Sequence, residues 1–214
     1  DRGLAFDGDA DRVFVVDETG NGLSGSTTTA ILAAATLRQH PGATVLHNLI
    51  CSKTVPEVVS ELGGTPVRTK VGHSFIKQIM AETGAVFGGE HSAHYYFARN
   101  FNADSGLIAS LMVMAEVGRS GQPLSVVRRP YERYEASGEI NTQVDDALAV
   151  IERISDEYAD FDQDRLDGLT VDCGSWWFNL RPSNTEPLLR LNLEAADRAS
   201  CDDAVGTLLA QITS

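Results

Sequence analysis

The sequence predicts an α/β three-layer sandwich domain followed by a smaller α+β domain with a mostly antiparallel sheet. Up to about residue 133, β-branched and apolar runs alternate with helical segments, which is typical of a layered α/β domain. Beyond that point three strand-like runs follow one another and helices close the segment, as in a separate α+β domain. We therefore expect a domain boundary near Tyr134.

The expected elements of the first part are separated by glycine, proline and polar turn signals. In order, they are a strand at 13–17, a helix at 26–40, a strand at 44–50, a helix at 52–62, a strand at 65–70, a helix at 73–83, a strand at 84–90 and a helix at 105–118. Pro41 and Gly42 end the first helix, because neither residue continues a helix well. The last of these helices carries apolar residues almost all round, so we expect it to be mostly buried.

In the second part, the expected strands and helices follow one another in a different order. A turn and a short helix lead to a linker, after which we expect a strand at 136–142, a helix at 145–158 and an acidic loop at 160–168. Strands at 169–173, 175–181 and 187–195 come next, and a helix at 198–212 ends the chain. Clustered strands of this kind indicate an antiparallel sheet closed by helices.

Composition excludes several classes of partner. The 214 residues carry a formal net charge of −13, which argues against nucleic acid and anionic membranes, because both need a basic surface. No apolar run approaches the ~20 residues that span a bilayer, and no signal peptide is evident. Three widely spaced cysteines form neither a metal pair nor a disulfide framework, so we expect buried thiols and a cytoplasmic location.

The motif "DGDADR" places Asp7, Asp9 and Asp11 on alternate positions, with Arg12 directly after them. Like charges this close repel unless a cation lies among them, and carboxylate oxygens suit a hard divalent cation. An EF-hand loop is one alternative, because the aspartates and Glu18 match four of its ligand positions. However, Arg12 stands where that loop needs glycine, and the flanking residues are strand-like.

Two further alternatives for this motif are a phosphatase loop and a plain surface turn. In haloacid-dehalogenase-type phosphatases a nucleophilic aspartate follows a strand, as Asp7 does here. Such a loop is expected to lead into a helix, whereas "VFVVD" continues as a strand. A simple acidic turn needs no spaced aspartates followed by arginine, so the metal-binding interpretation is favoured.

The stretch "KVGHSFIKQ" places His73 at the start of a helix, after a turn at Gly72. A helix N-terminus favours anions and keeps an imidazole neutral, so His73 could accept a proton near pH 7. Lys70 could balance negative charge beside it. The alternative is a histidine that only caps the helix.

The segment "GGEHSAHYYF" brings Glu90, Ser92 and His94 into one short loop after two glycines. A carboxylate and a hydroxyl at this spacing can bind neighbouring hydroxyls of a sugar. One alternative is a zinc site using His91 and His94, but zinc needs a third protein ligand and no other cysteine or histidine lies nearby in the sequence. A plain surface loop is the other.

The turn "RPSNTEP" lies between two expected strands of the second part. Arg181 can offer a planar pair of donors to a phosphate, while Ser183, Asn184 and Thr185 supply neutral donors. Backbone amides of such a turn can add to an anion nest. An ordinary hairpin turn is the alternative.

Taken together, "DGDADR", "KVGHSFIK", "GEHSAH" and "RPSNTEP" resemble the motifs of the α-D-phosphohexomutases, in particular the phosphomannomutase/phosphoglucomutase type. The order and spacing of the motifs agree, and the resemblance spans essentially the whole chain. It implies a four-domain enzyme that interconverts hexose 1-phosphate and hexose 6-phosphate, most naturally those of mannose or glucose, through a bisphosphate. A phosphoserine donates the phosphoryl group, and Mg²⁺ assists.

The resemblance also implies a role for each site residue. Asp7, Asp9 and Asp11 would bind Mg²⁺, and Arg12 would contact the transferring phosphate. Glu90 and Ser92 would bind the sugar, with His94 in the same pocket, while His73 and Lys70 would serve in proton handling and charge balance. The phosphate that is not transferred would be bound by Arg181, Ser183, Asn184 and Thr185.

Two departures from the family pattern matter. Some members have a lysine before the cysteine of "NLICSK", where this chain has Ile50, so that role is lost or supplied by Lys53. No serine here has the sequence context of the phosphoserine. We therefore expect a fragment: 1–19 as the end of the second mutase domain, 20–133 as the third and 134–214 as the fourth.

Such a fragment is expected to be inactive alone and to need the N-terminal domains of a parent chain as partners. Two other functions stay open. A truncated relative could bind hexose phosphates without catalysis, and a small phosphatase could use Asp7 as its nucleophile.

Overall fold

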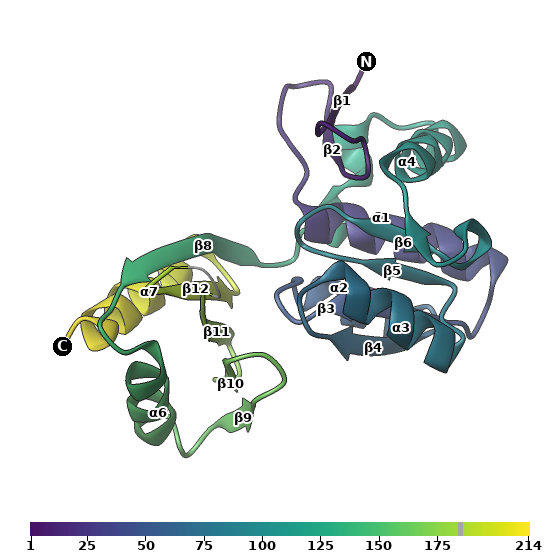
Figure 1. Ribbon diagram of the computed structural model, residues 1–214. Coiled ribbons are helices and arrows are strands. Elements are labelled where there is room, and N and C mark those ends of the chain that lie inside the picture. The colour runs from purple at the N-terminus through teal and green to yellow at the C-terminus, as the bar shows by residue number, and fades with distance from the viewer. Residues whose placement is uncertain (184–185) are drawn as a thin grey trace. The chain divides into compact units, whose positions relative to one another are not determined.

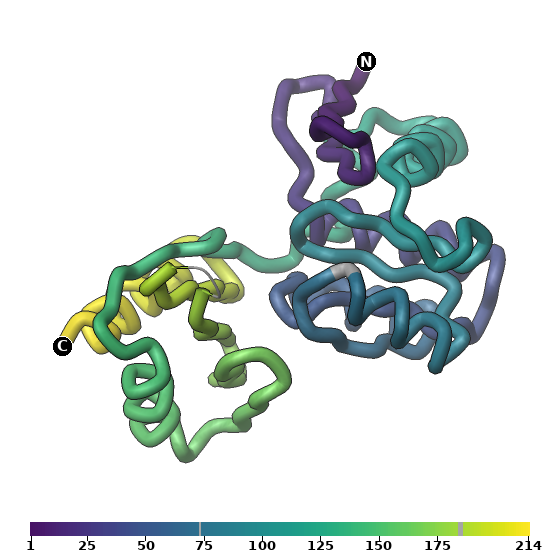
Figure 2. The backbone as a smooth tube through the Cα atoms, in the orientation of Figure 1, coloured from purple at the N-terminus to yellow at the C-terminus, as the bar shows by residue number. Residues whose placement is uncertain are grey.

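The computed structural model describes residues 1–183 and 186–214, except for the side chain of His73. The chain divides into two compact units, Asp1–Arg133 and Tyr134–Ser214 (Figures 1 and 2). Each unit has its own buried core. Among the described residues, no helix is both long and apolar enough to cross a membrane.

The first unit opens with an antiparallel hairpin of β1 (Gly3–Phe6) and β2 (Val13–Val16). Phe6 pairs with Val13, so the acidic motif forms the turn that joins the two strands. Val13 and Val15 are fully buried while Phe14 is exposed, which is the alternation expected of a half-buried strand.

A five-stranded mixed sheet forms the middle layer of this unit, with the order β4-β3-β5-β6-β7. Its strands are β3 (Thr44–Asn48), β4 (Thr65–Thr69), β5 (Phe87–Gly89), β6 (Tyr95–Phe97) and β7 (Ala103–Asp104). β3 runs parallel to β4 and β5, whereas β6 and β7 continue the sheet in antiparallel fashion. The sequence did not predict β6 and β7, because three and two residues are too short to show a period.

Helices cover both faces of this sheet and make the three layers. They are α1 (Gly25–Gln39), α2 (Thr54–Glu61), α3 (His73–Thr83) and α4 (Gly106–Ser120), followed by the short α5 (Leu124–Val127) and a 3₁₀ turn, η2 (Arg129–Tyr131). A further 3₁₀ turn, η1 (Ala98–Asn100), joins β6 to β7.

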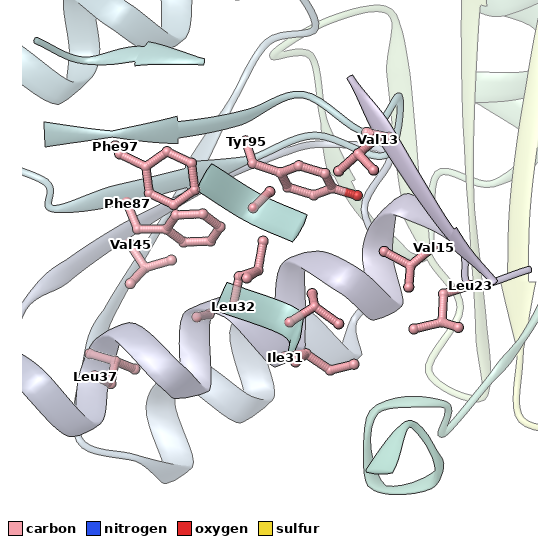
Figure 3. Close-up of a cluster of buried hydrophobic side chains, with 14 of the residues drawn as sticks. Val13, Val15, Leu23, Ile31, Leu32, Leu37, Val45, Phe87, Tyr95 and Phe97 are labelled. Atoms are coloured by element: carbon pink, nitrogen blue, oxygen red, sulfur yellow. The ribbon is translucent and has the colours of Figure 1, made fainter. Parts of the chain in front are cut away.

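The two faces of the sheet have separate cores. On one face, α1 and α4 pack with Val45, Phe87, Tyr95 and Phe97 of the strands, and Figure 3 shows these rings over Leu32 of α1. On the other face, Ile76 and Met80 of α3 pack against Leu46 and Tyr96. Alternate residues of β6 therefore belong to different cores.

The helix expected to be mostly buried is α4, and this expectation was wrong. Leu107 and Leu111 are 60% and 54% exposed, while only one stripe, including Ala109 and Val113, is buried. A helix that packs on one side buries one stripe only, and here α1 and β2 supply that side. It is α1 that is buried along nearly its whole length.

The second unit contains the antiparallel sheet expected from the sequence, in the order β8-β12-β11-β10-β9. The strands are β8 (Glu135–Gln143), β9 (Asp162–Asp164), β10 (Leu169–Asp172), β11 (Trp176–Pro182) and β12 (Leu188–Ala195). Two helices, α6 (Ala147–Glu157) and α7 (Arg198–Ile212), share its core. Part of the expected acidic loop is β9, an edge strand of polar residues held by backbone pairing to β10.

The fold class is therefore confirmed: an α/β three-layer domain precedes a smaller α+β domain with an antiparallel sheet. The expected helices at 73–83 and 198–212 have the bounds of α3 and α7. Asp197 caps α7 by accepting a hydrogen bond from the amide of Ser200, 2.8 Å away. No disulfide joins the three cysteines among the described residues; Cys51 and Cys201 are buried as expected, whereas Cys173 is only partly buried.

Candidate functional site

The acidic turn brings three carboxylates together. One oxygen each of Asp7, Asp9 and Asp11 can lie within 4.8 Å of the others. Ala10 has a φ of 60°, and its amide donates to the carbonyl of Asp7 at 3.3 Å, so the backbone reverses between the aspartates. Strands precede and follow the turn, which does not fit the helix–loop–helix of an EF-hand.

Arg12 closes the turn by binding its first aspartate. The Arg12 Nε donates to Asp7 Oδ2 at 2.7 Å, and the Arg12 amide donates to Asp7 Oδ1 at 3.3 Å. These bonds lower the pKa of the Asp7 carboxyl below its ordinary value. Arg12 therefore balances part of the negative charge of the turn.

The surroundings of Asp11 disfavour its ionised form and raise its pKa. Burial is the largest cause that raises its pKa, and the charges of Asp9 and Asp7 raise it further while His94 opposes them. Its Oδ1 is buried without a hydrogen-bond partner among the described residues. Clustered carboxylates with an unused oxygen form a donor set that suits a hard divalent cation such as Mg²⁺.

The acidic turn contacts the loop between β5 and β6. Arg12 and His94 form an isolated antiparallel bridge, and His94 Nε2 lies 3.7 Å from Asp11 Oδ2. Gly106 at the start of α4 completes the junction, because a Cβ there would lie only 2.8 Å from the carbonyl group of Arg12. The sequence motifs "DGDADR" and "GEHSAH" are therefore neighbours in space.

The β5–β6 loop is a tight turn closed by its own backbone. The Glu90 amide donates to the carbonyl of His94 at 3.0 Å, and the Ala93 amide donates to the carbonyl of Glu90 at 3.1 Å. Ala93 has a φ of 69°, which allows the reversal. Ser92 and His94 stay partly exposed, and Ser92 Oγ lies 3.1 Å from His94 Nδ1.

Glu90 itself is only 2% exposed, and protein donors surround its carboxylate. Oε1 accepts from the Gly72 amide at 3.1 Å and from Asn48 Nδ2 at 3.3 Å. Oε2 accepts from the Tyr96 hydroxyl at 2.8 Å and lies 3.5 Å from His94 Nδ1. Glu90 thus joins three segments: the end of β3, the turn before α3 and strand β6.

The turn before α3 contacts Glu90 through a backbone amide. Gly72 caps α3 with a φ of 128°, a conformation that favours glycine, and its amide reaches Glu90. Lys70 is exposed, and its Nζ lies 6.0 Å from the centre of the Phe75 ring. The predicted role of His73 depends on its side chain, which lies outside the described part of the structure.

The second unit holds the predicted phosphate-binding turn after β11. Arg181 Nη2 contacts Glu139 Oε2 at 3.0 Å, and Arg190 Nη1 lies 3.6 Å from Glu139 Oε1. Arg190 Nη2 also donates to Ser183 Oγ at 3.4 Å. The predicted sites at Asn184 and Thr185 lie outside the described residues.

Sequence reasoning missed four residues that the structure places at these sites: Asn48, Tyr96, Asp104 and Arg190. Asp104 can lie within 4.8 Å of ligand atoms of Asp11 and His94. Arg190 pairs directly with Arg181 across β11 and β12. The one usable sequence signal was Asn48, a polar residue at the carboxyl end of a buried strand, where α/β proteins place their sites.

Comparison with known proteins agrees with the motifs. The family described as "Phosphoglucomutase/phosphomannomutase, alpha/beta/alpha domain III" matches residues 24–134. The family described as "Phosphoglucomutase/phosphomannomutase, C-terminal domain" matches residues 139–208.

Individual relatives are similar over most of this chain. A phosphomannomutase of Methanocaldococcus jannaschii is 43% identical over 203 residues, which cover 95% of this chain and 45% of the relative. A phosphomannomutase of Escherichia coli is 41% identical over 198 residues, 91% of this chain and 43% of its own length. The chain thus spans about half the length of the curated relatives it matches.

Solved structures share the fold. A phosphoglucomutase/phosphomannomutase family protein from Burkholderia thailandensis matches with a TM-score of 0.87 and 27% identity, over 100% of this chain and 47% of that one. An N-acetylphosphoglucosamine mutase from Aspergillus fumigatus, solved with GlcNAc-6P and magnesium, has a TM-score of 0.74 at 14% identity over 99% of this chain and 52% of its own. The chain belongs to the phosphoglucomutase/phosphomannomutase family, of which it carries the α/β/α domain III and the C-terminal domain.

Proposed function

We propose that this chain supplies the sugar- and phosphate-binding part of a phosphohexomutase, which interconverts hexose 1-phosphate and hexose 6-phosphate of mannose or glucose through a bisphosphate. The observation that carries the proposal is the junction of the acidic turn with the Glu90 loop, where Arg12 pairs with His94. The proposed cation site and the proposed sugar-binding loop are thereby adjacent, which supports transfer of a phosphoryl group to or from a sugar.

The acidic turn is the proposed magnesium site. Asp7, Asp9 and Asp11 offer clustered oxygens, and Asp11 Oδ1 has no hydrogen-bond partner among the described residues, with Arg12 Nε 4.0 Å away. When bound, Mg²⁺ would neutralise charge on the oxygens of the transferring phosphate. Arg12 lies beside these carboxylates and would bind the same phosphate, since its guanidinium is partly exposed.

The β5–β6 loop is the proposed sugar site. Ser92 and His94 are partly exposed and would contact hydroxyls of the hexose, and the carboxylate of Glu90 would accept a hydrogen bond from a hydroxyl. Lys70 and His73 belong to the turn that Gly72 joins to Glu90, which supports their proposed roles in charge balance and proton transfer.

The turn after β11 is the proposed site for the phosphate that is not being transferred. Arg181 is the main donor, with Ser183, Asn184 and Thr185 as neutral donors. Arg190 adds a second guanidinium, because it lies directly across the strand pair from Arg181. Both guanidiniums contact Glu139, so a phosphate that binds them would replace this carboxylate as their partner.

The phosphoryl-donating serine is proposed to lie in another part of the polypeptide, since no serine of these 214 residues has the family's phosphoserine context. The first 19 residues would then be the end of the second mutase domain. The chain alone is expected to bind hexose phosphates without turning them over. The alternative is that the protein functions without the phosphoserine domain. It would then bind hexose phosphates without catalysing their conversion.

Two assays on the purified chain test the proposal. Mannose 1-phosphate should shift NMR signals of the Glu90 loop, and conversion to mannose 6-phosphate should be undetectable until the missing family domains are added. Hydrolysis of p-nitrophenyl phosphate that Asp7→Asn abolishes would instead support the phosphatase. Absence of any binding to the chain would contradict the proposal.

A further inference from the structure

We infer that Tyr96 is a positioning residue of the proposed sugar site, whose hydroxyl holds the Glu90 carboxylate in the orientation that meets the hexose. The inference rests on the proposed role of Glu90 in sugar binding. It adds a residue that lies outside the loop motif and touches the sugar only through Glu90.

The first step of the argument is the burial of Glu90. A carboxylate that is 2% exposed must have its oxygens satisfied by protein donors, because an unpaired buried charge is strongly unfavourable. A carboxylate can accept about four hydrogen bonds. Oε1 has two donors in the Gly72 amide and Asn48 Nδ2, so its capacity is filled.

Oε2 of Glu90 accepts fewer hydrogen bonds than Oε1 does. Its one hydrogen bond within 3 Å comes from Tyr96, and that bond is the shortest that Glu90 makes among the described residues, at 2.8 Å. His94 Nδ1 lies farther away, at 3.5 Å, and is shared with Ser92. Oε2 therefore retains capacity for a further hydrogen bond, which a hydroxyl of the hexose would supply alongside its contacts with Ser92 and His94.

Packing of the Tyr96 side chain fixes the position of its hydroxyl group. The side chain is fully buried in β6 and packs with Leu46, Ile76 and Met80. Burial and the charge of Glu90 raise the pKa of Tyr96, so the phenol stays a donor throughout the physiological range. Strand β6 thus anchors one end of the hydrogen bond, and Glu90 has little freedom to turn.

The chain offers a matched control in the next residue. Tyr95 is equally buried, but its ring lies on the opposite face of β6, in the core beside Val13 (Figure 3). Tyr96→Phe and Tyr95→Phe remove the same atom from adjacent positions of one strand. Only the first change removes a donor to Glu90.

The test is NMR titration of the whole chain with mannose 1-phosphate, glucose 1-phosphate and inorganic phosphate. Tyr96→Phe should weaken binding of the hexose phosphates about tenfold, because the Glu90 carboxylate is no longer held in the orientation that meets the sugar. Binding of inorganic phosphate should not change, because the sugar loop does not contribute to it. Tyr95→Phe should change neither affinity.

Each other outcome decides the matter. Equal loss of hexose phosphate and inorganic phosphate binding, or unchanged hexose phosphate binding in Tyr96→Phe, overturns the inference alone. A wild-type chain that binds inorganic phosphate but no hexose phosphate overturns the proposed sugar site, and this inference with it. If Tyr96→Phe does not fold, Glu90→Gln/Tyr96→Phe removes the buried charge as well. The double variant should bind hexose phosphate as weakly as the single variant Glu90→Gln does. A lower affinity in the double variant would show that Tyr96 does not act through Glu90.

Discussion

At the scale of single residues, the site is built from polar groups buried at the ends of strands. Asn48 at the end of β3 is fully buried and links three groups: its Nδ2 donates to Glu90, and its Oδ1 accepts from the His91 amide at 3.3 Å and from Cys51 Sγ at 3.1 Å. The neighbouring His47 is also buried. Such groups tie the stability of β3 to their protonation and hydrogen bonding.

The first prediction concerns the pH dependence that His47 gives to the fold. Burial lowers its pKa from 6.5 to about 4. Between these values the unfolded chain binds more protons than the folded one, so stability falls as pH falls from 6.5 toward 4 and is unaffected above that range. The slope from one such group is at most about 1.4 kcal/mol per pH unit.

Urea unfolding of wild type and His47→Gln at several pH values measures this effect. The variant should be less stable at pH 7 but should lose less stability on acidification. His40, exposed at the end of α1, provides the control, and His40→Gln should keep the wild-type slope. Parallel slopes for wild type and His47→Gln would contradict the prediction.

A second prediction at this scale concerns the acidic turn. Asp9→Asn removes one charge from the proposed magnesium site, and affinity of such sites depends on the number of charged ligands. We expect Mg²⁺ affinity, measured by calorimetry, to fall by about tenfold or more. Asp160→Asn, in an exposed position of the other unit, should leave it unchanged. Equal affinities of wild type and Asp9→Asn would place the cation elsewhere.

At the scale of elements, the acidic turn is positioned by what holds the β1–β2 hairpin. After β2, Asp17 forms a 2.8 Å ion pair with Arg128, and hydrogen bonds led by that from the Thr19 hydroxyl lower the pKa of Asp17. At the turn itself, α4 approaches the backbone of Arg12 at Gly106. Helix α4 therefore helps to place the proposed cation site.

The third prediction uses two glycines of α4. A Cβ at Gly106 would lie 2.8 Å from the carbonyl group of Arg12, so Gly106→Ala should displace the turn and destabilise the first unit by about 2 kcal/mol. Gly118, in the same helix, has nothing within 4 Å of such a Cβ. Gly118→Ala should stabilise the helix by up to about 1 kcal/mol. Thermal unfolding of both variants, with Mg²⁺ titrations, checks the contrast, and similar effects would contradict it.

At the scale of the whole chain, the sequence predicts local features well and long-range contacts poorly. Helix α7 was predicted with its bounds, and the structure shows that a local feature, the Asp197 cap, fixes its start. β6 and β7 were missed because such short strands exist only through their pairing with β5 and with each other. Glu90 was named as a candidate from its motif, but its partners Asn48 and Tyr96 were not, because only the folded sheet brings the end of β3 and the middle of β6 to that side chain.

The last prediction follows from the two separate cores. The second unit has its own buried core, formed by residues of β10, β11, β12, α6 and α7, so residues 134–214 should fold cooperatively without the first unit. This fragment contains Arg181 and Arg190, which the proposed phosphate site uses, so it should bind inorganic phosphate in an NMR titration. Arg181→Ala should weaken the binding strongly, because it removes one of the two guanidiniums that can donate to the phosphate. Arg165→Ala, which removes an exposed arginine paired with Glu152, should not. A folded fragment that ignores phosphate, or an equal effect of the two changes, would remove the second unit from the proposed site.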